Sequence, residues 1–262
     1  MSTEAQELAA VLQRRWNVIE ALRLTPRSKP ELVQACDVSR STVDRAIDEL
    51  TEYDICKRDH EVGYRLTPNG RCIVDLSETV GEGFDGIIAA GRAGLGFDVD
   101  EPDYGVMFVD AEIVTGEPHA PDQPLQEFCE RLRETPCLRG FTPVVLREFV
   151  EIGIDRLRSG GISLDLVVTP AVGEYLATEY PDAFRVDVAS DRANFHEATL
   201  PTSTGLAILG EDRYRSAVLL SYGNGGLEGF VETTNRLAVG WAERVFEVRK
   251  ENASPVRLRR PA

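Results

Sequence analysis

The order of apolar patterns in the first 79 residues is the feature that most constrains the fold. Apolar side chains recur every three or four residues over about 4–24, which predicts an amphipathic helix. A short helix is expected over 30–35, and a third helix begins at Ser39. The segments ICKR (55–58) and YRLT (64–67) then have the length and composition of two antiparallel strands. Three helices followed by a hairpin predict a winged helix-turn-helix.

The third predicted helix, within SRSTVDRAIDEL (39–50), separates an apolar face from a polar one. Ser39 is a residue type that is typical of N-caps. The face expected to pack inward consists of Val43, Ala46, Ile47 and Leu50. The face expected to point outward carries Ser41, Asp44, Arg45 and Asp48, with Arg40 and Thr42 beside the first turn. This division leaves the first turn of the helix free to meet a partner.

Double-stranded DNA is the partner that this surface predicts. Small hydroxyls and backbone amides at a helix N-terminus can approach phosphates closely. Arg40 and Arg45 are long enough to reach guanine edges or phosphates in the major groove. The hairpin adds further cations for the neighbouring backbone or minor groove. The predicted DNA-binding residues are Ser28, Lys29, Ser39, Arg40, Ser41, Thr42, Arg45, Lys57, Arg58 and Arg65.

Some residues in this region favour other interpretations. Asp44 and Asp48 have the wrong sign for DNA, although Asp44 could accept from a cytosine amino group or brace Arg45. His60, at the predicted hairpin tip, is interpreted as a solvated turn residue rather than a base reader. The alternative for the whole module is a winged helix that contacts only other proteins.

The charge of the chain is strongly acidic and uneven. There are 29 basic and 44 acidic residues, a net charge of −15, and only three of the basic residues are lysines. Acidic surfaces in which arginine replaces lysine resemble proteins of halophilic archaea, where hydrated carboxylates keep proteins soluble in concentrated salt. Residues 1–79 carry 11 basic and 14 acidic residues, whereas 80–262 carry 18 and 30. The first part therefore repels a polyanion less strongly than the second.

A domain boundary is predicted after residue 79. The apolar pattern over 71–90 is helical at first, and we expect Gly81, Gly83 and Gly86 to break it. The division expected is a winged helix-turn-helix over 1–79, a linker over 80–103, an α/β domain over 104–250, and a flexible tail over 251–262. The fold class is thus α+β, with an N-terminal winged helix-turn-helix and a C-terminal α/β domain that has a mixed sheet.

Within the second half, helical and strand patterns alternate. Strands are expected in YGVMFVDAEIVTG, ISLDLVVT, FRVDV, GLAILG, YRSAVLLSYG and GLEGFVET, and helices in DQPLQEFCERLRE, TPVVLREFVEIGIDRLRSG and PAVGEYLATEYPDAF. The closing helix, TNRLAVGWAERVFEVRK, is expected to turn Leu237, Trp241, Val245 and Val248 inward.

Several segments together carry a family resemblance. SRSTVDRAIDEL and YRLTPNGR precede PHAPDQPL, LRGFTPVVLREFV, LDLVVTPAVGEYLATEYPDAF and GGLEGFVETTNRLAVGWAERVF. This order resembles the archaeal transcriptional regulators whose C-terminal half is named after a methanogenesis regulatory protein, and it covers nearly the whole chain. The resemblance implies regulation of transcription and no particular ligand. Related chains often have a Leu-Pro-Phe-Gly-Leu-like run where TLPTSTGLAIL keeps Pro201 and Gly205 without the aromatic residue.

Catalytic and metal-binding motifs are not found in the sequence. There is no His-x-Lys pair, no Gly-x-Ser-x-Gly elbow and no Walker loop, and the five cysteines have neither zinc-site nor disulfide spacing. His196 and Glu197 would face opposite sides of a strand. We therefore expect no enzyme activity, cofactor or metal. The alternative is a hydrolytic α/β enzyme tethered to the winged helix, which would need His119 and His196 to share a carboxylate in one cleft.

The second domain is expected either to sense a small molecule or to dimerise the protein. The candidate ligand-binding residues lie in two irregular polar segments, PHAPDQPL and TLPTSTG, and are His119, Pro121, Thr202 and Ser203. A homodimer is expected because a two-fold protein matches a palindromic operator, with 71–90 and the Trp241 helix as candidate contacts. No apolar run is long enough to cross a bilayer, and we expect a cytoplasmic protein without a membrane partner.

Overall fold

The computed structural model describes residues 2–59, 62–181, 192–223 and 226–256. Within these ranges the chain forms two compact units that divide between Val80 and Gly81. The predicted α+β class and the mixed sheet are confirmed. No helix in the described ranges is both long and apolar enough to span a membrane.

The first unit contains three helices followed by a two-stranded hairpin, in the predicted order. The strands pair antiparallel, with Lys57 opposite Arg65. The backbone of Arg27 pairs with that of Tyr64, which adds a bridge beside the hairpin. The elements are α1 (Thr3–Leu22), α2 (Lys29–Cys36), α3 (Arg40–Glu52), β1 (Cys56–Asp59) and β2 (Gly63–Leu66), followed by the start of α4 (Pro68–Arg92).

One apolar core holds the first unit together. The predicted inward face of α3 is buried completely or almost completely, with Val43, Ala46 and Leu50 at 0% exposure and Ile47 at 2%. These side chains pack with Val18, Ile19 and Leu22 of α1 and with Leu32 of α2. Because α3 is held along this face, its opposite face and its first turn remain outside the core.

The second unit is built on an eight-stranded sheet with the order β10-β6-β5-β4-β7-β8-β9-β3. Strands β4, β5 and β6 are parallel, and the remaining pairs are antiparallel. Its strands are β3 (Glu112–Thr115), β4 (Cys137–Thr142), β5 (Ser163–Val168), β6 (Ala193–Glu197), β7 (Thr204–Leu209), β8 (Ser216–Gly223), β9 (Gly226–Thr233) and β10 (Ser254–Pro255). Its helices are α5 (Gln123–Glu134), α6 (Arg147–Arg158), α7 (Pro170–Glu179) and α9 (Arg236–Glu251), with short 3-10 helices η1 (Tyr104–Phe108) and η2 (Asp212–Tyr214).

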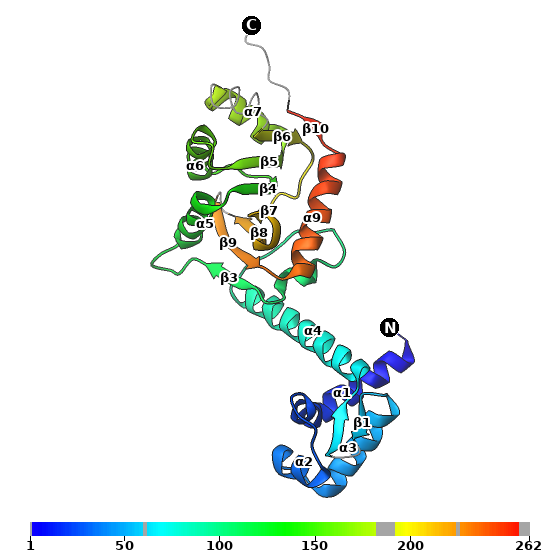
Figure 1. The fold of residues 1–262 in the computed structure, drawn as a ribbon. Helices are drawn as coiled ribbons and strands as arrows, with labels where there is room; N and C mark the ends of the chain where they lie inside the picture. Colours follow the sequence, from blue (N-terminus) through cyan, green and yellow to red (C-terminus); the bar gives the residue numbers. More distant parts are fainter. Residues whose placement is uncertain (1, 60–61, 182–191, 224–225, 257–262) are drawn as a thin grey trace. The chain divides into compact units, whose positions relative to one another are not determined.

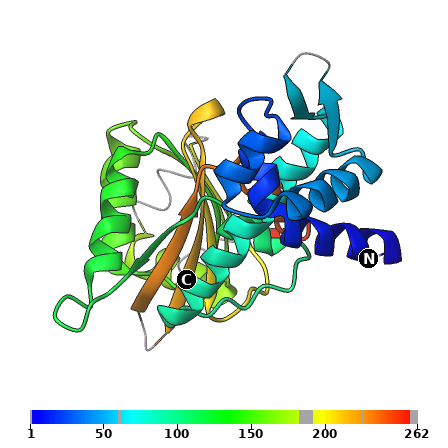
Figure 2. The ribbon, with the colours of Figure 1, turned by 90° about the horizontal axis from the view of Figure 1, so that it is seen from below.

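Helices cover both faces of this sheet (Figures 1 and 2). Along β7, Leu206 and Ile208 pack into the apolar cluster that contains Trp241 of α9. The alternate residues, Ala207 and Leu209, pack into the cluster that contains Phe128 of α5. A strand with both faces covered reads as a continuous apolar run, which is why GLAILG lacks the alternation of a surface strand.

The structure corrects several expectations about the second half. The glycines at 81, 83 and 86 do not break the helix, because α4 runs without interruption to Arg92, over part of the predicted linker. Strand β4 was not predicted, and the strand expected over 104–116 is a 3-10 helix followed by a strand of only four residues. Ser254 and Pro255, expected in the flexible tail, pair with β6. The expected strand FRVDV (184–188) lies outside the described residues.

The prediction of which residues of the closing helix α9 face inward was also partly wrong. Trp241 and Val245 are buried as expected, whereas Leu237 and Val248 are 60% and 52% exposed. Small residues and Phe246 complete the buried face instead: Ala238 and Ala242 are fully buried. The buried face is therefore the one whose residues pack into the apolar cluster beneath the sheet, together with Leu206 and Ile208 of β7.

Candidate nucleic-acid interface

The first turn of α3 is a compact cluster of hydroxyl groups. Ser39 is the N-cap, and its Oγ accepts a hydrogen bond from the backbone N of Thr42 at 3.2 Å. The same Oγ lies 2.9 Å from the hydroxyl of Ser41 and 2.8 Å from that of Thr42. The cap therefore fixes the hydroxyls among themselves, at the positive end of the helix dipole, where anions are favoured.

Two of the predicted arginines extend from α3 without a partner. Arg40 and Arg45 are exposed, and neither forms a hydrogen bond or ion pair with any residue that the structure describes. They lie five positions apart, with Arg40 at the first position of the helix and Arg45 in its second turn. Both guanidinium groups are therefore available to an external anion.

Lys29 is already engaged within the unit. Its Nζ lies 2.6 Å from Oδ1 of Asp44 and 5.7 Å from the centre of the Tyr64 ring. The hydrogen bond from Lys29 lowers the pKa of Asp44, and the same contact raises the pKa of Lys29. Asp44, which the sequence suggested as a brace for Arg45, instead links α3 to α2. Its negative charge is balanced mainly by Lys29, and the nearby charge of Arg40 also favours the ionised carboxylate.

On the hairpin, one predicted cation is paired and two are free. Arg65 lies 3.1 Å from Asp59, its diagonal neighbour across the strands. Asp59 thus offsets the repulsion between Arg65 and Lys57, which face each other directly. Lys57 and Arg58 are exposed and have no ion-pair partner among the described residues. His60 lies outside the described residues.

Ser28 is a structural cap in this arrangement. Its backbone N and its Oγ each donate to Oε2 of Glu31 at 2.7 Å, which forms a capping box at the start of α2. The hydrogen bond from the Ser28 hydroxyl, followed by the one from its backbone N, lowers the pKa of Glu31.

Sequence reasoning missed two residues that position the surface. Arg27 exchanges backbone hydrogen bonds with Tyr64 at 2.9 and 2.8 Å, so the hairpin is fixed beside the start of α2. Gly63 has φ +134°, and a Cβ there would lie 2.4 Å from the carbonyl oxygen of Arg27. A glycine within a strand often marks such a close backbone approach, and this signal was present in YDICKRDHEVGYRL.

Arg15 was missed for a different reason. It donates two hydrogen bonds to Glu49, at 3.0 and 2.9 Å, and so ties α1 to α3. The two residues are 34 positions apart, and no local pattern could pair them.

The predicted ligand-binding residues lie on two loops of the second unit. His119 is exposed and lies 3.5 Å from Glu117 of its own loop, to which Pro121 also belongs. The carbonyl of Ser203 accepts a hydrogen bond from the backbone N of Tyr222 at 2.8 Å, and Thr202 is exposed beside it. His119, Pro121, Thr202 and Ser203 do not line the apolar cavity described below.

The two described histidines do not share a carboxylate. His196 Nε2 lies 3.5 Å from Asp165, whereas His119 faces Glu117. Asp165 also binds Lys250. The described residues contain no group of three His, Cys, Asp or Glu side chains that could hold a metal ion. The geometry thus lacks the shared cleft that the hydrolytic alternative requires.

Comparison with known proteins gives two family matches. Residues 121–252 match the model described as methanogenesis regulatory protein FilR1, middle domain. Residues 3–85 match the model described as HVO_A0261 N-terminal domain. No match is found among the curated proteins.

Solved structures that align with this chain include three proteins. TrmBL2, described as an archaeal chromatin protein with a novel mode of DNA binding, aligns over 96% of this chain and 99% of its own, with 15% identity and a TM-score of 0.41. NucT from Helicobacter pylori aligns over 55% of this chain and 98% of its own, with 9% identity and a TM-score of 0.40. A phospholipase D family member, Nuc from Salmonella typhimurium, aligns over 56% and 99%, with 11% identity and a TM-score of 0.39.

Proposed function

This chain belongs to the family of the methanogenesis regulatory protein FilR1, middle domain, and from this premise we propose that it is a DNA-binding transcriptional regulator. Residues 1–79 form the DNA-binding part, and 104–250 form the regulatory part. The observation that carries the proposal is the pair of exposed, unpartnered arginines, Arg40 and Arg45, on a helix whose opposite face is fully packed.

In this proposal, α3 enters the major groove with its first turn towards the DNA. Arg45 contacts base edges, and Arg40 contacts a phosphate or a base near the capped turn. The amides at the start of α3 and the hydroxyls of Ser41 and Thr42 face the backbone. Lys57 and Arg58, on the hairpin, contact the flanking phosphates. Ser28, Lys29 and Arg65 keep supporting roles, because each is tied to a carboxylate of its own unit.

The test begins with genome-wide mapping of the sites that the protein occupies, which supplies an operator. Affinity for that operator is then measured with Arg45→Ala, which should cost about 1–3 kcal/mol if the side chain forms a bidentate base contact. Arg133→Ala, at an exposed position of α5 in the second unit, is the matched control and should bind like the parent. Unchanged affinity of the Arg45 variant for the operator would show that Arg45 does not contact the DNA, and it would contradict the proposed contact in the major groove.

We also propose that the regulator acts as a homodimer through α4. Three apolar side chains in the part of this helix that belongs to the second unit are exposed, and two of them lie three and four residues after the first: Phe84, Ile87 and Ile88. A row of exposed apolar residues is typical of a contact surface, and a second copy presents the same row. Phe84→Glu should shift the mass measured by light scattering from dimer towards monomer, whereas Asp85→Asn, at an exposed neighbour, should not. A monomeric parent protein would refute this part of the proposal.

A further inference from the structure

The two faces of the sheet in the second unit differ in how they are packed. On the α9 side, the buried apolar residues form one cluster, which runs from Phe108 through Leu206 to Phe246. On the side of α5, α6 and α7, they divide into three smaller clusters, around Phe230, Leu164 and Val172. A cavity of about 140 Å³ lies among these three clusters. Protein interiors are normally close-packed, so an opening of this size is a feature that needs an explanation.

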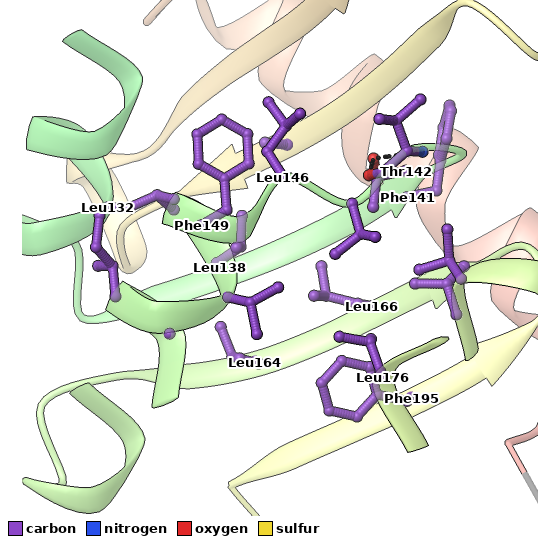
Figure 3. Close-up of a pocket in the computed structure, with 18 of the residues that line it drawn as sticks. Leu132, Leu138, Phe141, Thr142, Leu146, Phe149, Leu164, Leu166, Leu176 and Phe195 are labelled. Carbon is purple, nitrogen blue, oxygen red and sulfur yellow. Dashed lines mark hydrogen bonds between the residues drawn. The ribbon is translucent and has the colours of Figure 1, made fainter. Parts of the chain in front are cut away.

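The cavity is lined almost entirely by apolar side chains. Figure 3 shows Leu138, Leu164 and Leu166 on neighbouring strands, with Leu146 and Phe149 at the start of α6 also bordering the space. None of the described residues that line it is charged. An ion buried here would lose its hydration without gaining a partner, so the cavity favours a neutral occupant.

Two hydroxyl groups give the cavity one polar end. Thr142 Oγ1 lies 2.6 Å from the carbonyl oxygen of Val144 and 3.2 Å from the hydroxyl of Tyr222. The threonine has a single hydrogen to donate. If this hydrogen goes to Val144, the oxygen of Tyr222 keeps a free acceptor site, and if it goes to Tyr222, the tyrosine hydrogen is free. In either case Tyr222 can form one more hydrogen bond. Burial raises the pKa of Tyr222 to about 12, so this hydroxyl stays neutral.

A glycine in α6 leaves the space unfilled. Gly153 lines the cavity, and a Cβ placed there would lie 3.8 Å from the nearest atom, Cδ1 of Leu164. That is ordinary van der Waals distance, so no close contact requires glycine at this position. Glycine within a helix is less favourable than alanine. The sequence therefore keeps an unfavourable residue where a larger one would fit and would begin to fill the cavity.

From these features we propose that the cavity between the sheet and α6 binds a small neutral molecule that is apolar except for one hydroxyl or carbonyl group, which hydrogen-bonds to Tyr222. An apolar cavity of about 150 Å³ is large enough for a benzene ring, so a single substituted ring or a short aliphatic alcohol matches the volume. The inference deepens the regulatory role under the proposed function, since it supplies the signal that the second unit receives.

The test measures binding to the full chain in the absence of DNA, by calorimetry, with 4-methylphenol as the probe. Toluene is the comparison without a hydroxyl, and 4-methylbenzoate is the comparison with a charge. Gly153→Leu places a side chain in the cavity and should lower the affinity for 4-methylphenol and toluene by about tenfold or more. Gly240→Leu is the matched control: it makes the same change on a helix at a site with open space, and it should leave binding unchanged. Tyr222→Phe should weaken 4-methylphenol about tenfold and leave toluene unchanged.

Three outcomes would overturn the inference. They are no binding of either neutral probe to the folded parent, equal binding to the Gly153→Leu variant, and binding of 4-methylbenzoate as tight as that of 4-methylphenol. If Tyr222→Phe weakens both neutral probes equally, the assigned hydrogen bond is wrong. Circular dichroism confirms that each variant is folded, and Leu166→Phe serves as a second filling variant. Operator affinity, measured separately, shows whether the DNA-binding proposal fails independently of this one.

Discussion

At the scale of single residues, ion pairs within the first unit determine which of its cations remain available to contact DNA. Of the predicted cations, Lys29 and Arg65 are paired with Asp44 and Asp59, whereas Arg40 and Arg45 are not. The sequence predicted the residue types on this surface but not their pairing. Lys29 and Asp44 lie 15 positions apart on different helices, and only the packing of α2 against α3 brings them together.

Glu49 provides a pH-dependent contribution to the stability of the first unit. The hydrogen bonds from Arg15 lower the pKa of Glu49 below its ordinary value of 4.5. Stability from this pair is therefore fully present above about pH 4.5 and is lost as the pH falls through the lower folded-state pKa. Thermal melts between pH 2 and 6 should show Glu49→Gln losing less stability on acidification than the parent. Parallel pH profiles for the two proteins would contradict this assignment.

At the scale of elements, the hairpin depends on one close backbone contact. Gly63→Ala would place a Cβ against the carbonyl of Arg27, at a φ of +134° that other residues rarely adopt. We expect a loss of about 1–3 kcal/mol in the free energy of unfolding, measured by denaturant titration. Gly91→Ala, within α4 where nothing lies within 4 Å, should be neutral or slightly stabilising. Equal stability of the two variants would show that the Arg27–Tyr64 bridge does not fix the hairpin.

Elements with strong local signals were predicted correctly, and those that depend on distant contacts were not. The cap at Ser39 and the stripe of α3 are local, and both are confirmed. Strand β4 was missed because Arg139 and Gly140 interrupt its apolar residues, and only its pairing with β5 and β7 makes it a strand. Helix α4 persists through its glycines because tertiary packing holds it: a Cβ at Gly86 would lie 2.3 Å from the carbonyl oxygen of Phe108, so the helix backbone lies close against that segment. The apolar cavity could not have been predicted, since it is a property of three helices and five strands together.

At the scale of the whole molecule, charge limits how DNA can be held. The chain has a net charge of −15, and residues 80–262 contribute −12 of it. At about 1 M salt the screening length is only about 3 Å, so repulsion from these carboxylates no longer reaches the DNA. The same screening weakens the phosphate contacts. Concentrated salt therefore suits a regulator that relies on base contacts rather than on its overall charge.

Operator affinity measured across a KCl series tests this balance. Four cations of this surface have no ion-pair partner among the described residues, namely Arg40, Arg45, Lys57 and Arg58, and they set the largest number of phosphate contacts that these residues can form. With about 0.9 ions released per phosphate, log K against log[KCl] should have a slope no steeper than about −4 per protomer. Arg58→Ala should make the slope shallower by about 1, because this residue is assigned to a phosphate. Arg45→Ala should lower the affinity at every salt concentration and leave the slope unchanged, because a base contact releases no condensed ion. A slope well beyond −4 would mean that cations outside these four also contact phosphates. A slope that Arg45→Ala changes as much as Arg58→Ala does would mean that Arg45 contacts a phosphate of the DNA and not a base.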